Sequence, residues 1–186
     1  MVANLVLCLL AFTIFLIYNI VAIHQFGVPS SLSNTYYLYN GIKKNLGYVF
    51  TAMMFFMGMT LLPAWLSLGE TISNWSSYLQ PLSFFAAGSI CFVGAAPAFR
   101  SCKMESTVHS VAAKLAAACS LLWCFVACWQ IMYVPIIAVG VVCAICFGIP
   151  STRERFKKTQ VYWLEMMAFV ATFATVITEC IIQLCK

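Results

Sequence analysis

The chain has 186 residues, of which 63% are hydrophobic and only 8% are charged, and it contains no aspartate. Water-soluble domains carry about 25% charged residues, so this composition excludes an ordinary soluble domain and predicts an integral membrane protein. The net charge of +5 requires no nucleic-acid partner, because basic loops are the ordinary topology signal of such a protein.

Apolar runs along the chain predict six membrane-spanning helices. About 20 residues are needed to cross ~30 Å of hydrocarbon, and a backbone in lipid must satisfy its own hydrogen bonds as a helix. The predicted fold class is all-α: a polytopic six-transmembrane-helix bundle that forms one domain over residues 1–186. The predicted helices cover residues 3–23, 46–68, 81–99, 108–129, 133–149 and 160–184.

Prolines and flanking residues refine these helices. Pro29, Pro81 and Pro150 are expected at helix edges, and Pro63 and Pro97 inside helix ends, where they would kink the chain. The first run has neither a basic flank nor a small-residue cleavage pattern, so we expect a retained helix rather than a signal peptide.

Cations gather in the loops that follow the first, third and fifth predicted helices. The positive-inside rule places these loops in the cytoplasm and both termini outside. Aromatic belts are expected to contain Trp65, Trp75, Trp129 and Tyr133 on the outer side and Tyr48, Tyr162 and Trp163 on the inner side. The loop cations are Lys43, Lys44, Arg100, Lys103, Arg153, Arg155, Lys157 and Lys158.

The stretch VPSSLSNTYYLYN, residues 28–40, is polar and aromatic in an otherwise apolar chain. It belongs to a connection, residues 24–45, that is far longer than two antiparallel helices need. Two interpretations are open. The stretch is either a loop that anchors the bundle in the headgroup layer, or a lid that folds over a polar pocket. A lid would bring Ser33 to the pocket and would pack Tyr36 or Tyr37 near His109.

Ionisable residues at the same membrane face favour a pocket. His109 and Lys114 lie on the fourth predicted helix, Glu165 lies one turn into the sixth, and Arg100 lies in the loop after the third. Ionisable groups at membrane depth usually face a bundle interior and pair, so we expect Glu165 to pair with Lys114 or His109. Alternatively, Lys114 extends its long stem to the interface, and His109 is a structural hydrogen-bonding group.

Helical periodicity places polar residues on one stripe of the sixth predicted helix. Such a stripe either seals the helix against its neighbours or lines a water-filled path, and packing is the favoured interpretation. The stripe contains Glu165, Ala168, Thr172, Thr175, Glu179 and Gln183. Small residues on the fourth helix predict close helix packing; they are Ala112, Ala113, Ala116, Ala117 and Ser120.

Metal and redox motifs are weak in this chain. Eight of the ten cysteines lie in predicted spans, including the CAIC motif at Cys143 and Cys146, and are interpreted as small hydrophobic residues. The two histidines show no ligand spacing, so no metal and no cofactor is predicted. Without aspartate there is no Asp-based dyad or triad, although a loop serine with His109 as base is conceivable.

Four motifs resemble a group of small bacterial six-helix membrane proteins of unknown function: PSSLSNTYY, FVGAAPAF, VHSVAA and WLEM. The layout is also similar to the DRAM/Frag/Sfk-type proteins and to the ceramidase/progestin-receptor-like superfamily of intramembrane hydrolases. Those hydrolases use three metal-binding histidines and an aspartate, whereas this chain has two histidines and no aspartate. The bacterial resemblance marks Ser33, Tyr36, Tyr37, Pro97, His109 and Glu165.

These observations predict non-enzymatic binding or handling of a lipid or small amphiphile in a polar pocket on the cytoplasmic side. The expected partners are membrane lipids. Two alternatives stay open: an intramembrane lipid hydrolase, and a homo-oligomer that conducts ions or protons along the stripe of the sixth helix.

Overall fold

The computed structural model describes residues 1–72, 76–97, 100, 103–131, 137, 141 and 156–186. Five of its helices are long and apolar enough to cross a membrane, within the part of the chain that is described. The chain is therefore a polytopic helical membrane protein. The helices are α1 (Val2–Phe26), α2 (Thr35–Ile42), α3 (Tyr48–Ile72), α4 (Ser76–Ala95), α5 (Lys103–Ala127) and α8 (Gln160–Cys185).

Five of the six predicted spans are confirmed, with ends that differ by up to five residues. The prediction for residues 133–149 falls almost wholly outside the described residues, and only Ile137 and Val141 are described there, both as helical. Two proline predictions are wrong. Pro81 lies inside α4, which begins at Ser76. Pro97 follows α4 rather than lying in it, because that helix ends at Ala95.

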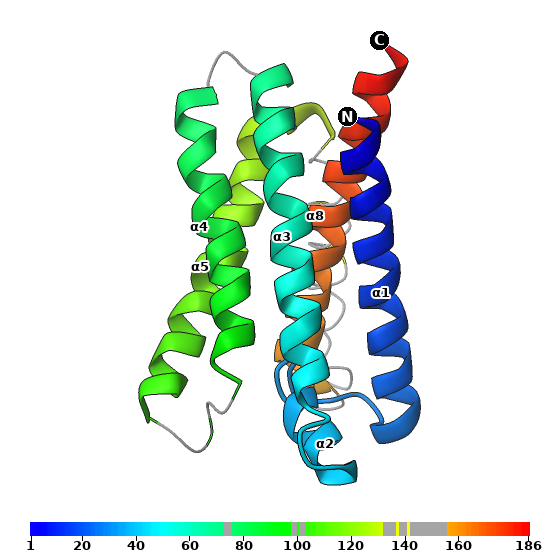
Figure 1. Ribbon diagram of the computed structural model, residues 1–186, viewed down its shortest axis with the longest axis vertical. Coiled ribbons are helices and arrows are strands. Elements are labelled where there is room, and N and C mark those ends of the chain that lie inside the picture. The colour runs from blue at the N-terminus through cyan, green and yellow to red at the C-terminus, as the bar shows by residue number, and fades with distance from the viewer. Residues whose placement is uncertain (73–75, 98–99, 101–102, 132–136, 138–140, 142–155) are drawn as a thin grey trace.

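The bundle has two opposite ends, at which the helices begin and end (Figure 1). The amino and carboxyl termini lie at one end, and α2 lies at the other together with the lower ends of α1, α3, α4, α5 and α8. The exposed Lys43, Lys44, Lys103, Lys157 and Lys158 therefore all lie at the α2 end. Arg153 and Arg155, which share the predicted cytoplasmic side, lie outside the described residues.

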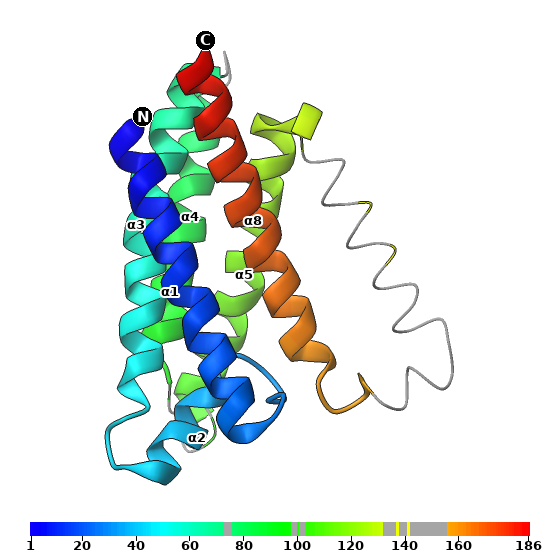
Figure 2. The same cartoon turned by 90° about the vertical axis from the view of Figure 1, so that its right-hand side faces the viewer.

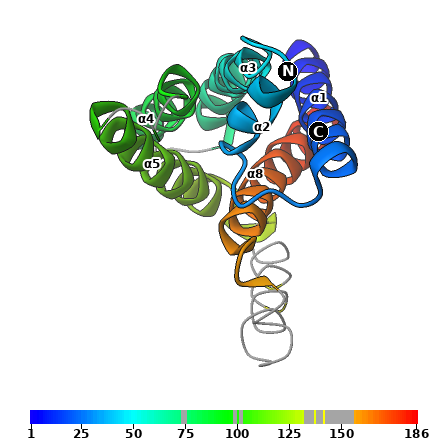
Figure 3. The same cartoon turned by 90° about the horizontal axis from the view of Figure 1, so that it is seen from below.

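Seen from the α2 end, the bundle has two sides (Figure 3). Helices α4 and α5 lie together on one side, α1 and α8 lie on the other, and α3 joins them. Helices α3 and α4 pack closely against each other, and the Thr51 hydroxyl donates to the Gly94 carbonyl at 2.9 Å. Figure 2 shows α8 running beside α1 from the α2 end to the end that holds both termini.

Large aromatic side chains fill the centre, and this corrects part of the predicted belts. Trp65 and Tyr162 were expected at the two interfaces, but neither is exposed at all. Trp65 packs instead against Trp123 of α5, with ring centroids 6.1 Å apart. Tyr48 and Trp129 are more than half exposed, as an interface position requires. Trp75 and Tyr133 lie outside the described residues.

Candidate functional site

The polar segment between α1 and α3 folds against the bundle instead of lying flat on a surface. Gly27 ends α1 in the left-handed region, with a φ of 71°, and so turns the chain back. The Tyr18 hydroxyl of α1 lies 2.6 Å from the Thr35 hydroxyl, which starts α2. The interpretation of a segment that covers the bundle is therefore better supported than a surface anchor. Leu32, Ser33, Thr35, Tyr36 and Tyr39 are all buried.

Two hydrogen bonds fasten this segment to the start of α8. The Leu32 backbone N–H donates to Oε2 of Glu165 at 2.7 Å, and the Tyr162 N–H donates to the Ser30 carbonyl at 3.3 Å. The first turn of a helix leaves its N–H groups without intrahelical partners, so Ser30 satisfies one of them. Tyr162 also links α8 to α1, because its hydroxyl donates to Oδ1 of the buried Asn19 at 3.1 Å.

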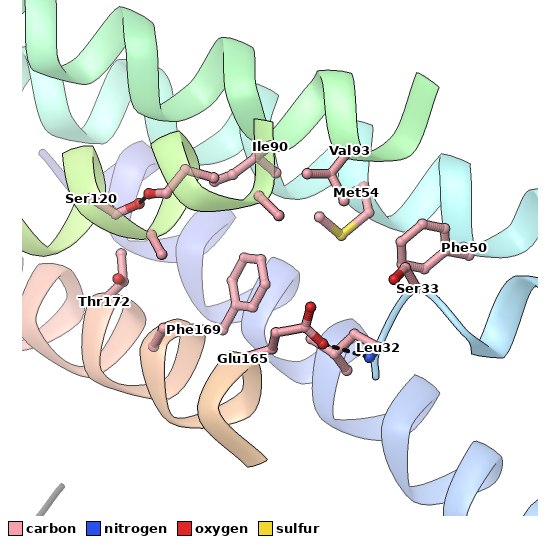
Figure 4. A pocket seen from close by; sticks show the side chains of 14 residues that line it. Leu32, Ser33, Phe50, Met54, Ile90, Val93, Ser120, Glu165, Phe169 and Thr172 are labelled. Carbon is pink, nitrogen blue, oxygen red and sulfur yellow. Dashed lines mark hydrogen bonds between the residues drawn. The ribbon is translucent and has the colours of Figure 1, made fainter. Parts of the chain in front are cut away.

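A pocket lies between this segment and the helices α3, α4, α5 and α8 (Figure 4). Its empty volume, with its open mouth included, is about 580 Å³. Most of its wall is apolar, and the larger apolar side chains are Phe50, Met54, Ile90, Val93 and Phe169. The polar side chains on the wall are Ser33, Ser120, Glu165 and Thr172. The site is therefore an apolar cavity with a carboxylate near the α2 end.

The polar groups of the wall differ in the hydrogen bonds that they already make within the protein. The Ser120 hydroxyl donates to the Ala116 carbonyl of its own helix. The Ser33 hydroxyl lies 3.2 Å from that of Ser31. Glu165 uses only Oε2 for the Leu32 N–H, and its second carboxylate oxygen points into the cavity (Figure 4). This oxygen is the strongest acceptor that the pocket offers.

The predicted ion pair of Glu165 is wrong for the described residues. Lys114 is exposed and does not line the pocket, so its stem follows the alternative of reaching the surface. His109 is buried, but its Nδ1 lies 3.0 Å from the Ala96 carbonyl, and it does not line the pocket either. His109 therefore fits the structural alternative: it ties α5 to the end of α4.

Tyr36, Tyr37 and Arg100 also lie outside the pocket wall. The Arg100 backbone N–H donates to the Tyr37 hydroxyl at 2.8 Å, and the guanidinium lies 5.0 Å from the centre of the Tyr37 ring. Tyr36 packs edge-on against Tyr37 and Tyr48, and its burial raises the pKa of its phenol. The tyrosines thus hold the segment against the turn between α4 and α5, which leaves Leu32 and Ser33 to line the pocket.

The polar stripe of α8 divides into two parts. At the α2 end, Glu165 and Thr172 line the pocket. Further along, Thr175 and Glu179 are buried, the Thr175 hydroxyl donates to the Ala171 carbonyl at 2.7 Å, and the Gln183 side-chain amide donates to Oε1 of Glu179 at 2.7 Å. This second part is buried, and these two hydrogen bonds lie within α8, so the packing interpretation stays a prediction.

Several pocket residues were missed from sequence. The small residues Ala113, Ala116 and Ala117 were expected to let helices pack closely, and α5 does pack against α4, but these residues also line the cavity. Phe169 carried a usable signal, because it lies one helical turn from Glu165. Leu32 carried none, since it takes part through its backbone N–H.

No known protein family, curated protein or solved structure matches this chain. Within the residues that the structure describes, no group of three His, Cys, Asp or Glu side chains is arranged to hold a metal ion.

Proposed function

We propose that the protein binds a lipid or small amphiphile in this pocket, with the hydrocarbon chain along the apolar wall and the polar group near Glu165. The observation that carries the proposal is a mostly apolar cavity with a carboxylate oxygen turned into it. Concave sites that are mostly apolar with a few convergent polar groups are typical of ligand sites. An alkyl chain would contact the apolar wall, and a polar headgroup would lie in the part of the pocket nearest α2, beside Glu165.

The proposed setting is a six-helix bundle in a bacterial inner membrane, with both termini outside and the α2 end in the cytoplasm. The gathering of exposed lysines at the α2 end supports this orientation, because cytoplasmic loops carry an excess of lysine and arginine. The pocket would then open on the cytoplasmic side, where its ligand would enter from the inner leaflet.

The two alternative functions have less support than binding. A serine hydrolase would need Ser33 and His109 at one place, but only Ser33 lines the pocket, while His109 contacts the Ala96 carbonyl. Conduction along α8 would need a wet stripe, but Thr175 and Glu179 are buried and bonded within α8.

Filling the pocket is expected to abolish ligand binding. Ala117 lines the cavity, so Ala117→Phe places a ring where the alkyl chain would lie. In vesicles, a photoreactive hexadecyl probe should crosslink to the unmodified protein and at least tenfold less to Ala117→Phe.

Ala118 provides the matched control, because it is the next residue on α5 and is exposed. Ala118→Phe adds the same ring outside the pocket and should crosslink as the unmodified protein does. Equal crosslinking of all three proteins would show that the probe binds elsewhere, and the proposed pocket function would be wrong.

The orientation gives a separate prediction in a chain reduced to one thiol at a time. Cys185 is exposed near the carboxyl terminus, and an impermeant maleimide should label it in intact cells. A Lys44→Cys thiol at the α2 end should be labelled only after the cells are permeabilised. Labelling of Lys44→Cys in intact cells would reverse the orientation.

A further inference from the structure

Glu165 is the only charged side chain on the pocket wall, as far as the described residues go. Its Oε2 is held by the Leu32 N–H at 2.7 Å, and its other oxygen points toward the apolar part of the cavity (Figure 4). Ionisable groups at membrane depth are costly and are normally paired with an opposite charge. A lone backbone N–H is a small compensation for a carboxylate in such surroundings.

The cations that were candidates to pair with Glu165 do not line the pocket. Lys114 is exposed, and the Arg100 guanidinium lies over the Tyr37 ring. His109 is engaged at the Ala96 carbonyl. The described residues therefore bring no protein cation to the carboxylate, which faces the pocket.

We propose that the pocket selects amphiphiles whose polar group is a protonated amine. This inference rests on the proposed binding of an amphiphile in the same pocket. The ammonium group donates a hydrogen bond to the free oxygen of Glu165, and the Ser33 hydroxyl can accept a second one. Charge-assisted bonds of this kind are roughly twice as strong as neutral ones. Phe169, one turn further along α8, adds an aromatic face that favours a nearby cation.

Other polar groups fit the same wall less well. A carboxylate or phosphate would place a second negative charge beside Glu165, and like charges in one site disfavour the ionised forms of both. An alcohol would donate one hydrogen bond to Glu165 but would bring no positive charge to compensate the carboxylate. A quaternary ammonium would bring charge but no donor.

The test uses displacement of the photoreactive hexadecyl probe by four unlabelled competitors with one chain length: hexadecylamine, hexadecanol, hexadecanoic acid and N-acetylhexadecylamine. Hexadecylamine is expected to displace the probe at a concentration at least tenfold lower than each of the other three. The N-acetyl compound keeps the chain and nitrogen but removes the charge, so this comparison needs no variant.

Glu165→Gln then tests whether the preference for the amine depends on the negative charge of Glu165. Glutamine has the same shape, and its carbonyl oxygen can still accept from the Leu32 N–H, while the negative charge is lost. The advantage of the amine over the alcohol should fall to about twofold or less, while displacement by hexadecanol stays unchanged. Glu179→Gln serves as the control, since it makes the same change in α8 at a residue outside the pocket wall, and it should keep the preference for the amine.

Each result decides the inference. An equal ranking of the four competitors, or a preference for the acid, would overturn the selection of amines while leaving amphiphile binding intact. A preference for the amine that survives Glu165→Gln would also overturn it, because the charge would then act from elsewhere. Failure of the probe to bind in the pocket, shown by Ala117→Phe having no effect, would overturn both proposals.

Discussion

Replacing Trp123 by alanine is expected to lower the free energy of unfolding by about 3–5 kcal/mol, the usual cost of removing a large aromatic side chain from a packed core. Trp123 of α5 is fully buried and packs against the fully buried Trp65 of α3. The two rings bring α3 and α5 into direct contact, and each of these helices also packs against α4. Removing the Trp123 ring would leave a cavity between α3 and α5. Reversible unfolding in mixed detergent micelles measures the loss.

Trp129 is the matched control for this substitution. It lies two residues beyond the end of α5, is 56% exposed and contacts Phe125 edge-on. Trp129→Ala removes the same side chain without opening a cavity in the core and should cost less than about 1 kcal/mol. Equal losses for the two variants would mean that the Trp65–Trp123 contact does not stabilise the bundle.

Apolar run length was sufficient to predict five spans, because a backbone in lipid has no alternative to helical hydrogen bonding. The helix ends were less accurate. The polar starts of α4, at Ser76, and α5, at Lys103, continue their helices beyond the apolar runs. Run length alone cannot locate such an end, since polar residues can still be helical where water or headgroups surround them.

Aromatic residues show a second limit of sequence reasoning. Trp65 and Tyr162 were assigned to interfaces because amphipathic rings favour the headgroup layer. Tyr162 is buried because Asn19 of α1 offers its hydroxyl a partner, and Trp65 is buried because Trp123 of α5 lies opposite. Asn19 lies on a different helix from Tyr162, and Trp123 lies on a different helix from Trp65. Neither contact could therefore be identified from the local sequence.

The site was predicted in part, and for a similar reason. Ser33 and Glu165 were expected at a pocket, because a polar segment and a carboxylate at membrane depth both need partners, and both residues line the cavity. The partner of Glu165 was expected to be a side chain and is the Leu32 backbone N–H. Every residue except proline carries such a donor, so its use depends on the path of the folded chain and cannot be recognised in the sequence.

Gly94→Ala is expected to lower the free energy of unfolding by about 1–3 kcal/mol, the usual cost of overpacking. A Cβ at Gly94 would lie 2.8 Å from Cβ of Met54 and 3.2 Å from the Thr51 carbonyl oxygen. Both atoms are held by the α3 backbone, so the whole of α3 would have to move away from α4. The same shift would weaken the hydrogen bond from the Thr51 hydroxyl to the Gly94 carbonyl.

Gly88→Ala makes the same chemical change six residues earlier in α4 and should have the opposite sign. A Cβ at Gly88 would meet nothing within 4 Å, so no helix needs to move. Alanine is favoured over glycine by about 1 kcal/mol inside a helix, and that gain should appear as higher stability. Unfolding of both variants in the same micelles gives the comparison. A Gly94→Ala variant as stable as Gly88→Ala would show that α3 and α4 are not in contact at Gly94.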